Sequence, residues 1–196
     1  MFAALLFGVA LTTAGVQEPS AQQLFERGNL DAAVSRVQEQ GEAAPPDQVY
    51  LQALAHRKAS RNEEAKAAFN RLAAAGDNAW GAIGRSGVAL IDGNLDAALQ
   101  EAQQAVQKED GNAHARYQLG LVHAARGEHA PAAEAFAQAA ERNPSFAYAH
   151  YNAGMQFYEA KRIDRMAVFF ENFLKLAPEA PERGAVESIM RTVRGR

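Results

Sequence analysis

Five short segments with a shared pattern recur along the chain, and their spacing limits the possible folds more than any other feature. Each segment joins a turn to the first residues of a helical run, and the final residues of successive segments are 32, 33, 34 and 34 positions apart. A near-constant period of this length indicates supersecondary units that stack and bury a continuous core between neighbours. The segments span residues 28–33, 60–65, 93–98, 127–132 and 161–166.

The composition favours helices over strands within each period. Alanine accounts for 44 of the 196 residues, whereas aromatic residues make up only 8%. Alanine is the strongest helix former, while strands are enriched in β-branched and aromatic residues. We therefore expect two helices in each period. The predicted pairs are 18–27 with 30–40, 46–59 with 62–75, 79–92 with 95–108, 113–126 with 129–142, and 147–160 with 163–176.

The clearest unit, residues 113–146, carries aromatic, Leu-Gly, Gly, Ala and Pro residues at positions that identify a known repeat. These residues are Tyr117, Leu119, Gly120, Gly127, Ala132, Phe136, Ala139 and Pro144. The pattern resembles that of the tetratricopeptide repeat family. The resemblance implies an all-α, right-handed superhelical solenoid of antiparallel helix pairs, with about five repeats.

The resemblance covers roughly residues 18–180 and departs from the family in places. Lys161, Met166 and Phe173 stand where the family prefers small residues, and this predicts looser or reshaped packing in the last repeat. We place the repeats at about 14–45, 46–78, 79–112, 113–146 and 147–180. Residues 181–196 form a predicted C-terminal capping helix, because its apolar residues share one face. Those residues are Val186, Ile189, Met190 and Val193.

Residues 1–15 are predicted to be a signal peptide. Residues 2–11 form an uncharged apolar run that is too short to span a bilayer, and small residues follow it at 12–15. The expected location is therefore the periplasm or the exterior of the cell. No basic residue precedes the run, so two alternatives stay open: a cytoplasmic protein whose run is a helix of the first repeat, or a start further upstream.

The sequence contains no motif for catalysis or cofactor binding. The chain has no cysteine, a net charge of −3 and no phosphate-binding or nucleophile motif. The glycine-rich stretch 81–87 lies within an expected helix and lacks the Lys-Ser/Thr pair of a phosphate loop. We expect no enzyme activity, no cofactor, no metal and no nucleic acid partner. The five histidines show no metal-ligand spacing and are interpreted as packing residues: His56, His114, His123, His129 and His150.

A stripe of aromatic and large apolar residues is predicted to line a binding groove. In this family the first helix of each pair lines the concave face, and all five tyrosines fall on first helices. Tyrosine and tryptophan dominate binding hot spots because they offer apolar area with little rotamer entropy to lose. In the last pair, packing of the first helix (147–160) onto the second (163–176) is assigned instead to Ala153, Gly154 and Phe157. The predicted groove residues are Tyr50, Trp80, Ile83, Tyr117, Leu121, Tyr148, Tyr151, Met155 and Tyr158. One alternative stays open: Tyr50, Tyr117 and Tyr151 share a position that is often aromatic in this family, so they could pack between neighbouring repeats without any ligand.

The resemblance implies a non-catalytic scaffold that binds a peptide or helix of a protein partner in this groove. If exported, it would serve in the assembly of bacterial envelope complexes, as a monomer without a membrane span in the mature chain. Two alternatives remain: a self-associating or docking subunit that uses the convex face or the cap, and a regulatory part of an enzyme. Some family members hold a peptide carboxylate with several cations. The groove positions here offer only Arg57, with Lys58 beside it, so that binding mode is not expected.

Overall fold

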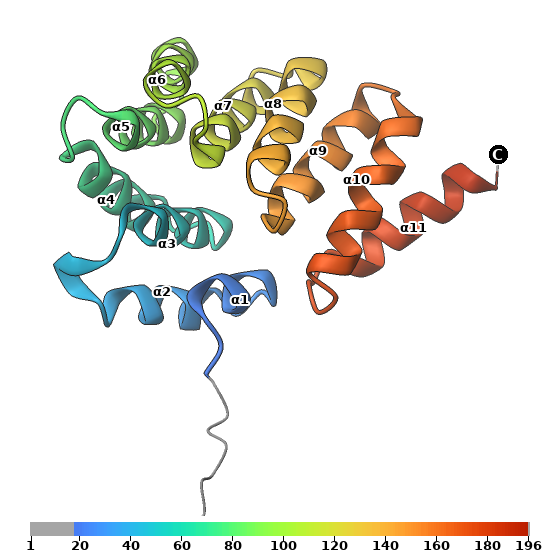
Figure 1. The fold of residues 1–196 in the computed structure, drawn as a ribbon, viewed down its shortest axis with the longest axis horizontal. Coiled ribbons are helices and arrows are strands. Elements are labelled where there is room, and N and C mark those ends of the chain that lie inside the picture. Colours follow the sequence, from blue (N-terminus) through green and yellow to red (C-terminus); the bar gives the residue numbers. More distant parts are fainter. Residues whose placement is uncertain (1–17, 196) are drawn as a thin grey trace, which may run out of the picture.

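The computed structural model describes residues 18–195, and every regular element within that range is helical. The helices form five antiparallel pairs and a last single helix, which follow one another along a curved solenoid (Figure 1). This confirms the predicted fold class. The predicted signal peptide lies outside the described residues. No helix between residues 18 and 195 is both long enough and apolar enough to cross a bilayer.

The observed helices agree with the predicted ranges to within three residues at each end. The first helices of the pairs are α1 (Ala21–Glu26), α3 (Pro46–Lys58), α5 (Ala79–Ile91), α7 (Ala113–Ala125) and α9 (Ala147–Glu159). The second helices are α2 (Leu30–Gln38), α4 (Asn62–Ala73), α6 (Leu95–Lys108), α8 (His129–Arg142) and α10 (Ile163–Leu176). A single 3-10 turn (Gly41–Ala43) precedes α3, and α11 (Arg183–Arg194) follows the last pair.

Each pair turns through a residue in the left-handed conformation. Gly28, Gly93 and Gly127 have φ between 73° and 79° at this position, as a helix-closing glycine allows. Ser60 and Lys161 take the same conformation with φ of 59° and 61°, although they carry side chains. The turn geometry is therefore kept in all five pairs, even where the glycine is missing.

Glycines on the first helices let the paired helices approach closely. A Cβ atom on Gly120 would lie 2.7 Å from the ring of Phe136, and one on Gly154 would meet the ring of Phe170 in the same way. At Gly84 the obstacle is the backbone of α4, because a Cβ atom would lie 2.9 Å from the carbonyl carbon of Leu72. The glycine-rich stretch 81–87 thus belongs to a tight helix interface.

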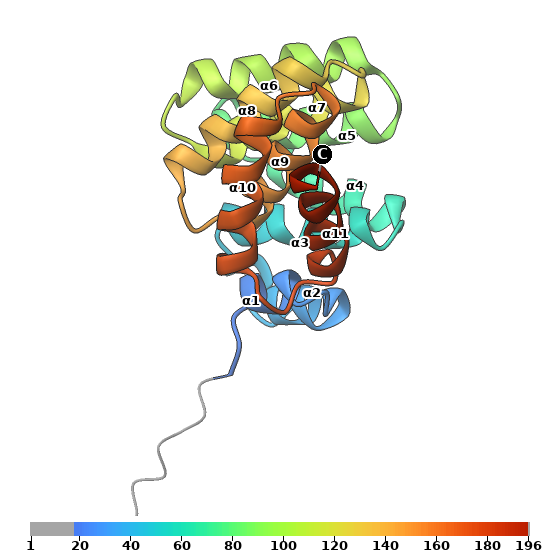
Figure 2. The same cartoon turned by 90° about the vertical axis from the view of Figure 1, so that its right-hand side faces the viewer.

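The two ends of the superhelix meet. The first pair and the segment before α11 lie side by side in two perpendicular views (Figures 1 and 2). Arg27 forms an ion pair with Glu179 at 3.2 Å, and Gly28 packs against the ring of Pro181. The concave face of the superhelix therefore surrounds a closed interior. After this segment, α11 packs on α10 and buries Val186 and Met190, which accords with its predicted capping role.

Candidate functional site

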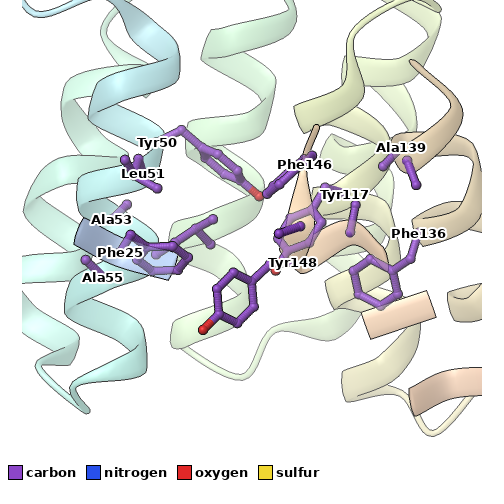
Figure 3. Close-up of a cluster of buried hydrophobic side chains, with 14 of the residues drawn as sticks. Phe25, Tyr50, Leu51, Ala53, Ala55, Tyr117, Phe136, Ala139, Phe146 and Tyr148 are labelled. Carbon is purple, nitrogen blue, oxygen red and sulfur yellow. The ribbon is translucent and has the colours of Figure 1, made fainter. Parts of the chain in front are cut away.

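Aromatic side chains fill much of the interior of the closed superhelix. Tyr50, Tyr117 and Tyr148 are only 1%, 4% and 4% exposed, and their rings gather between the helices (Figure 3). Tyr50 meets Tyr117 edge-on with 6.4 Å between ring centroids, and Tyr148 meets Phe25 of α1 at 4.9 Å. Edge-to-face pairs at such distances are the favoured aromatic geometry. The rings thus join repeats that are distant in the sequence.

Two side-chain amides fix the orientation of the tyrosine hydroxyls. The Tyr50 hydroxyl donates to Gln118 Oε1 at 3.0 Å, and Gln118 Nε2 donates to the hydroxyl of Ser86 at 3.1 Å. Asn152 Nδ2 donates to the Tyr117 hydroxyl at 2.7 Å. Because Gln118 is fully buried, these bonds satisfy groups that would otherwise be unpaired inside the protein. The interior is therefore a core of aromatic rings whose hydroxyl and amide groups are joined by hydrogen bonds.

Two cavities remain beside this core, on the concave side. The first, about 270 Å³, lies between α3, α7, α9 and the segment before α11. The second, about 190 Å³, lies nearer the start of α3 and α7. Each is smaller than a typical small-ligand pocket of ~300–1,000 Å³, so each suits one or two side chains. The first cavity is lined by Phe25, Leu54, Arg57, Lys58, Tyr117, Leu121, Tyr148, Tyr151, Asn152 and Glu182.

Arg57 contributes an unpaired cation to the larger cavity. Its Nη1 atom is buried and has no hydrogen-bond partner, and no ion pair joins its guanidinium group to a described carboxylate. Burial raises the pKa of the Tyr117 hydroxyl, and the charge of Arg57 partly offsets this rise. The guanidinium group therefore acts on the phenol groups of the interior while one of its own N–H donors stays unused.

Lys58, next to Arg57, is fully engaged in closing the superhelix. Its Nζ atom lies 2.5 Å from Glu182 Oε1, donates to the Tyr148 hydroxyl, and sits 4.1 Å from the centroid of the Tyr148 ring. The Tyr148 hydroxyl donates in turn to Glu182 Oε2 at 2.8 Å. Burial, followed by the nearby Glu182 charge, raises the pKa of Tyr148. These three residues form a latch that links α3, α9 and the segment before α11.

The histidines take structural positions in the described part of the chain. His114 packs among aromatic rings, with 5.2 Å between its centroid and that of Trp80. His150 binds the carbonyl oxygen of Pro144, and His123 Nδ1 lies 2.5 Å from Glu128 Oε2. Burial lowers the pKa of both His114 and His150. Between residues 18 and 195, no three acidic, histidine or cysteine side chains are grouped as metal ligands would be.

The predicted groove residues are distributed over more than one cavity, although the Tyr50 ring contacts those of both Tyr117 and Trp80. Tyr117, Leu121, Tyr148 and Tyr151 line the larger cavity, whereas Tyr50 lines the smaller one. Tyr158 lies at another cavity beside α11. Lining neither central cavity are Trp80, Ile83 and Met155.

The assignment of packing within the last helix pair needs a correction. Ala153, Gly154 and Phe157 are buried as predicted, but Tyr148 and Tyr151 also pack on the second helix. Their ring centroids lie 6.0 Å and 5.1 Å from that of Phe173. The reason is that Phe173 replaces the alanine of the two preceding repeats, Ala105 and Ala139, and its larger ring reaches the two tyrosines. The tyrosine stripe therefore also stabilises this pair.

Several residues of the site were not identified from the sequence. Gln118 and Asn152 each follow a tyrosine and are one repeat apart, so the Tyr-amide pair was a detectable signal. Phe25 and Glu182 come from the two ends of the chain and carry no signal in the repeat pattern. Only the closure of the superhelix brings them to the cavity.

Comparisons with known proteins agree with the repeat architecture. A sequence model described as tetratricopeptide repeat matches residues 114–145. The chain is 33% identical over 98 residues to the photosystem I assembly protein Ycf3 of Acaryochloris marina, a match that covers 44% of this chain and 59% of that relative.

Solved structures support the fold. The structure of TTC0263, a thermophilic TPR protein of Thermus thermophilus, has a TM-score of 0.61 and 19% identity, covering 88% of this chain and 94% of that one. The structure of MamA has a TM-score of 0.50 and 19% identity, covering 82% and 96% of the two chains. At these identities the similarity concerns the fold alone.

Proposed function

We propose that this chain, whose repeats match those of tetratricopeptide-repeat proteins in sequence pattern and fold, is a non-catalytic scaffold that binds a segment of a protein partner on its concave side during assembly of a larger complex. Proteins of this repeat family generally act as interaction scaffolds rather than catalysts. The relative from Acaryochloris marina is named as an assembly protein, and this supports the assembly role proposed here.

The observation that carries the proposal is the unpaired Arg57 in the larger central cavity. A buried N–H donor without an acceptor costs ~1–3 kcal/mol, more when the group is charged. A partner carboxylate entering the cavity would satisfy this donor, while Tyr151 and Leu121 offer apolar contact around it. One free cation makes a site for a single acidic side chain rather than a clamp with several cations.

The size of the cavity sets how the partner would bind. About 270 Å³ accommodates one or two side chains but not a helix, and Tyr117 and Tyr148 already occupy the interior beside it. We therefore place the partner segment across the mouth of the cavity, with one acidic side chain inserted toward Arg57. Entry of a whole helix would require the latch of Lys58 and Glu182 to open.

The Arg57→Leu variant tests this proposal, because stability and binding should change in opposite directions. Leucine has a similar helix propensity and removes a partly buried guanidinium group whose Nη1 donor is unpaired, so the thermal midpoint should stay level or rise. Affinity for a partner captured by the parent chain should fall at least about tenfold. Arg142→Leu is the matched control, since Arg142 lies on a second helix and is 48% exposed. Unchanged binding by Arg57→Leu would refute the proposed site.

We further propose that the mature protein works in the cell envelope, after removal of the apolar N-terminal run. The run at 2–11 and the small residues at 12–15 support cleavage after Ala14 or Gly15. Intact-mass analysis of protein recovered from an envelope fraction measures this. A mature protein that retains Met1 and Phe2 would refute it.

A further inference from the structure

The capping helix α11 covers the last repeat at one end and leaves an open cavity at the other. Val186 is fully buried and Met190 is 7% exposed, whereas Val193, one turn further on, is only partly buried. A cavity of about 420 Å³ lies between this end of α11 and the turn from α9 to α10. It is larger than either central cavity. Its lining consists of Tyr158, Lys161, Ile163, Thr192 and Val193.

Two cations without a carboxylate partner lie beside this cavity among the described side chains: Lys161 in its lining, and Arg191 immediately before the lining residue Thr192. Among the described side chains, Lys161 makes a cation–π contact with the ring of Tyr158 but no ion pair. Arg191 is exposed and forms no ion pair with a described carboxylate. The acidic residues nearby are Glu159, which is exposed, and Asp164, which pairs with Arg162 at 3.7 Å.

We infer that this C-terminal cavity, lined by Tyr158, Ile163 and Val193, is a second interaction site that binds an acidic protein segment with one large apolar anchor residue. The anchor fills the space between Tyr158 and Val193, where it gains buried apolar area. Carboxylates beside the anchor meet Lys161 and Arg191. The site goes beyond the proposed concave site, because it shares no residue with the cavity around Arg57.

Charge and burial favour this occupant over two others. A second copy joined through the same end would bring two sets of unpaired cations together, which is unfavourable. An anionic membrane would need the apolar face of α11, but that face is turned toward the repeat, where Val186 and Met190 are buried. An acidic partner segment uses the charge and the open cavity without displacing the helix.

Selection of displayed random peptides on the full chain tests this inference. Peptides that also bind the Val193→Asp variant, which places a charge at the cavity, are then removed. We expect the enriched peptides to combine one aromatic or long aliphatic residue with flanking Asp or Glu. A synthetic enriched peptide, measured by calorimetry, should lose at least about tenfold in affinity with Val193→Asp and a smaller factor with Arg191→Glu.

Matched variants and two further measurements decide the outcome. Val168→Asp introduces the same change at a valine that is 57% exposed on α10, and should leave the affinity within about twofold. Arg57→Leu should also bind the peptide normally, so that failure of the concave site is distinguishable from failure of this one. Enriched peptides without acidic residues, or equal losses from Val168→Asp and Val193→Asp, would overturn the inference. So would dimer formation or binding to anionic vesicles that Val193→Asp abolishes, measured by light scattering and co-sedimentation.

Discussion

Replacement of Gly84 by alanine should destabilise the protein, although alanine is the better helix former. Gly84 lies in α5 where this helix crosses α4. A Cβ atom there would lie 2.9 Å from the carbonyl carbon of Leu72 and closer still to backbone atoms of Phe69 and Ala73. Backbone atoms inside a helix cannot rotate away as a side chain can, so the two helices must separate.

The magnitude follows from two opposing effects. Alanine in place of a helical glycine stabilises by up to ~1 kcal/mol. Overpacking a tight interface costs ~1–3 kcal/mol or more, and the rigid obstacle at Gly84 favours the upper end of that range. We expect a net loss of ~1–2 kcal/mol. For a domain of this size, that lowers the thermal midpoint by roughly 2–8 °C.

Circular dichroism during heating measures the effect, with Gly184→Ala as the matched control. Gly184 is also helical, but an added Cβ atom meets nothing within 4 Å. Its replacement should therefore leave the midpoint level or raise it slightly. If Gly84→Ala proved as stable as Gly184→Ala, the close approach of α4 and α5 would be wrong.

Three further perturbations test the interior. Gln118→Leu should lower stability by ~1–3 kcal/mol in chemical denaturation, because the buried Tyr50 hydroxyl loses its acceptor; an unchanged midpoint would exclude that bond. Lys58→Met should cost ~1–3 kcal/mol by leaving the Glu182 carboxylate unpaired at a site only 19% exposed, and equal stability at low salt would argue against the latch. Acidification from pH 7.5 to 5 should lower the thermal midpoint, because burial depresses the folded-state pKa of three histidines. The unfolded chain, with histidine pKa near ~6.5, therefore binds more protons than the folded chain as the pH falls. A midpoint that rises on acidification would contradict this. The histidines concerned are His56, His114 and His150.

The sequence contained most of the fold because contacts between neighbouring helices repeat. Gly120 faces Phe136 and Gly154 faces Phe170, so the same glycine–aromatic contact recurs with the same period as the turns. Helix ends were predictable for a similar reason. Ser60 and Lys161 show the limit of that reasoning, since the turn forms there without the expected glycine.

The candidate site was less predictable because it depends on how tightly the superhelix curves. The repeat pattern places the tyrosines on one face, but it does not say that Tyr50 reaches Gln118, 68 residues later. Closure between Lys58 and Glu182 spans 124 residues and involves no repeated position. The repeat register places Arg57 at a groove position and Lys58 beside it, but it does not show which of the two cations is paired. Only the three-dimensional arrangement shows that Lys58 is paired and Arg57 is not.

Photo-cross-linking from within the larger cavity tests the central claim most directly, namely that a partner segment binds at the concave cavity around Arg57. A benzophenone amino acid in place of Tyr151 keeps an aromatic side chain at the half-buried wall of the cavity. As a control, the benzophenone amino acid replaces Val168, which is exposed on α10 of the last repeat. After irradiation with the captured partner, the first probe should yield a cross-link to an acidic segment and the second should yield none. A cross-link from position 168 alone would contradict the account.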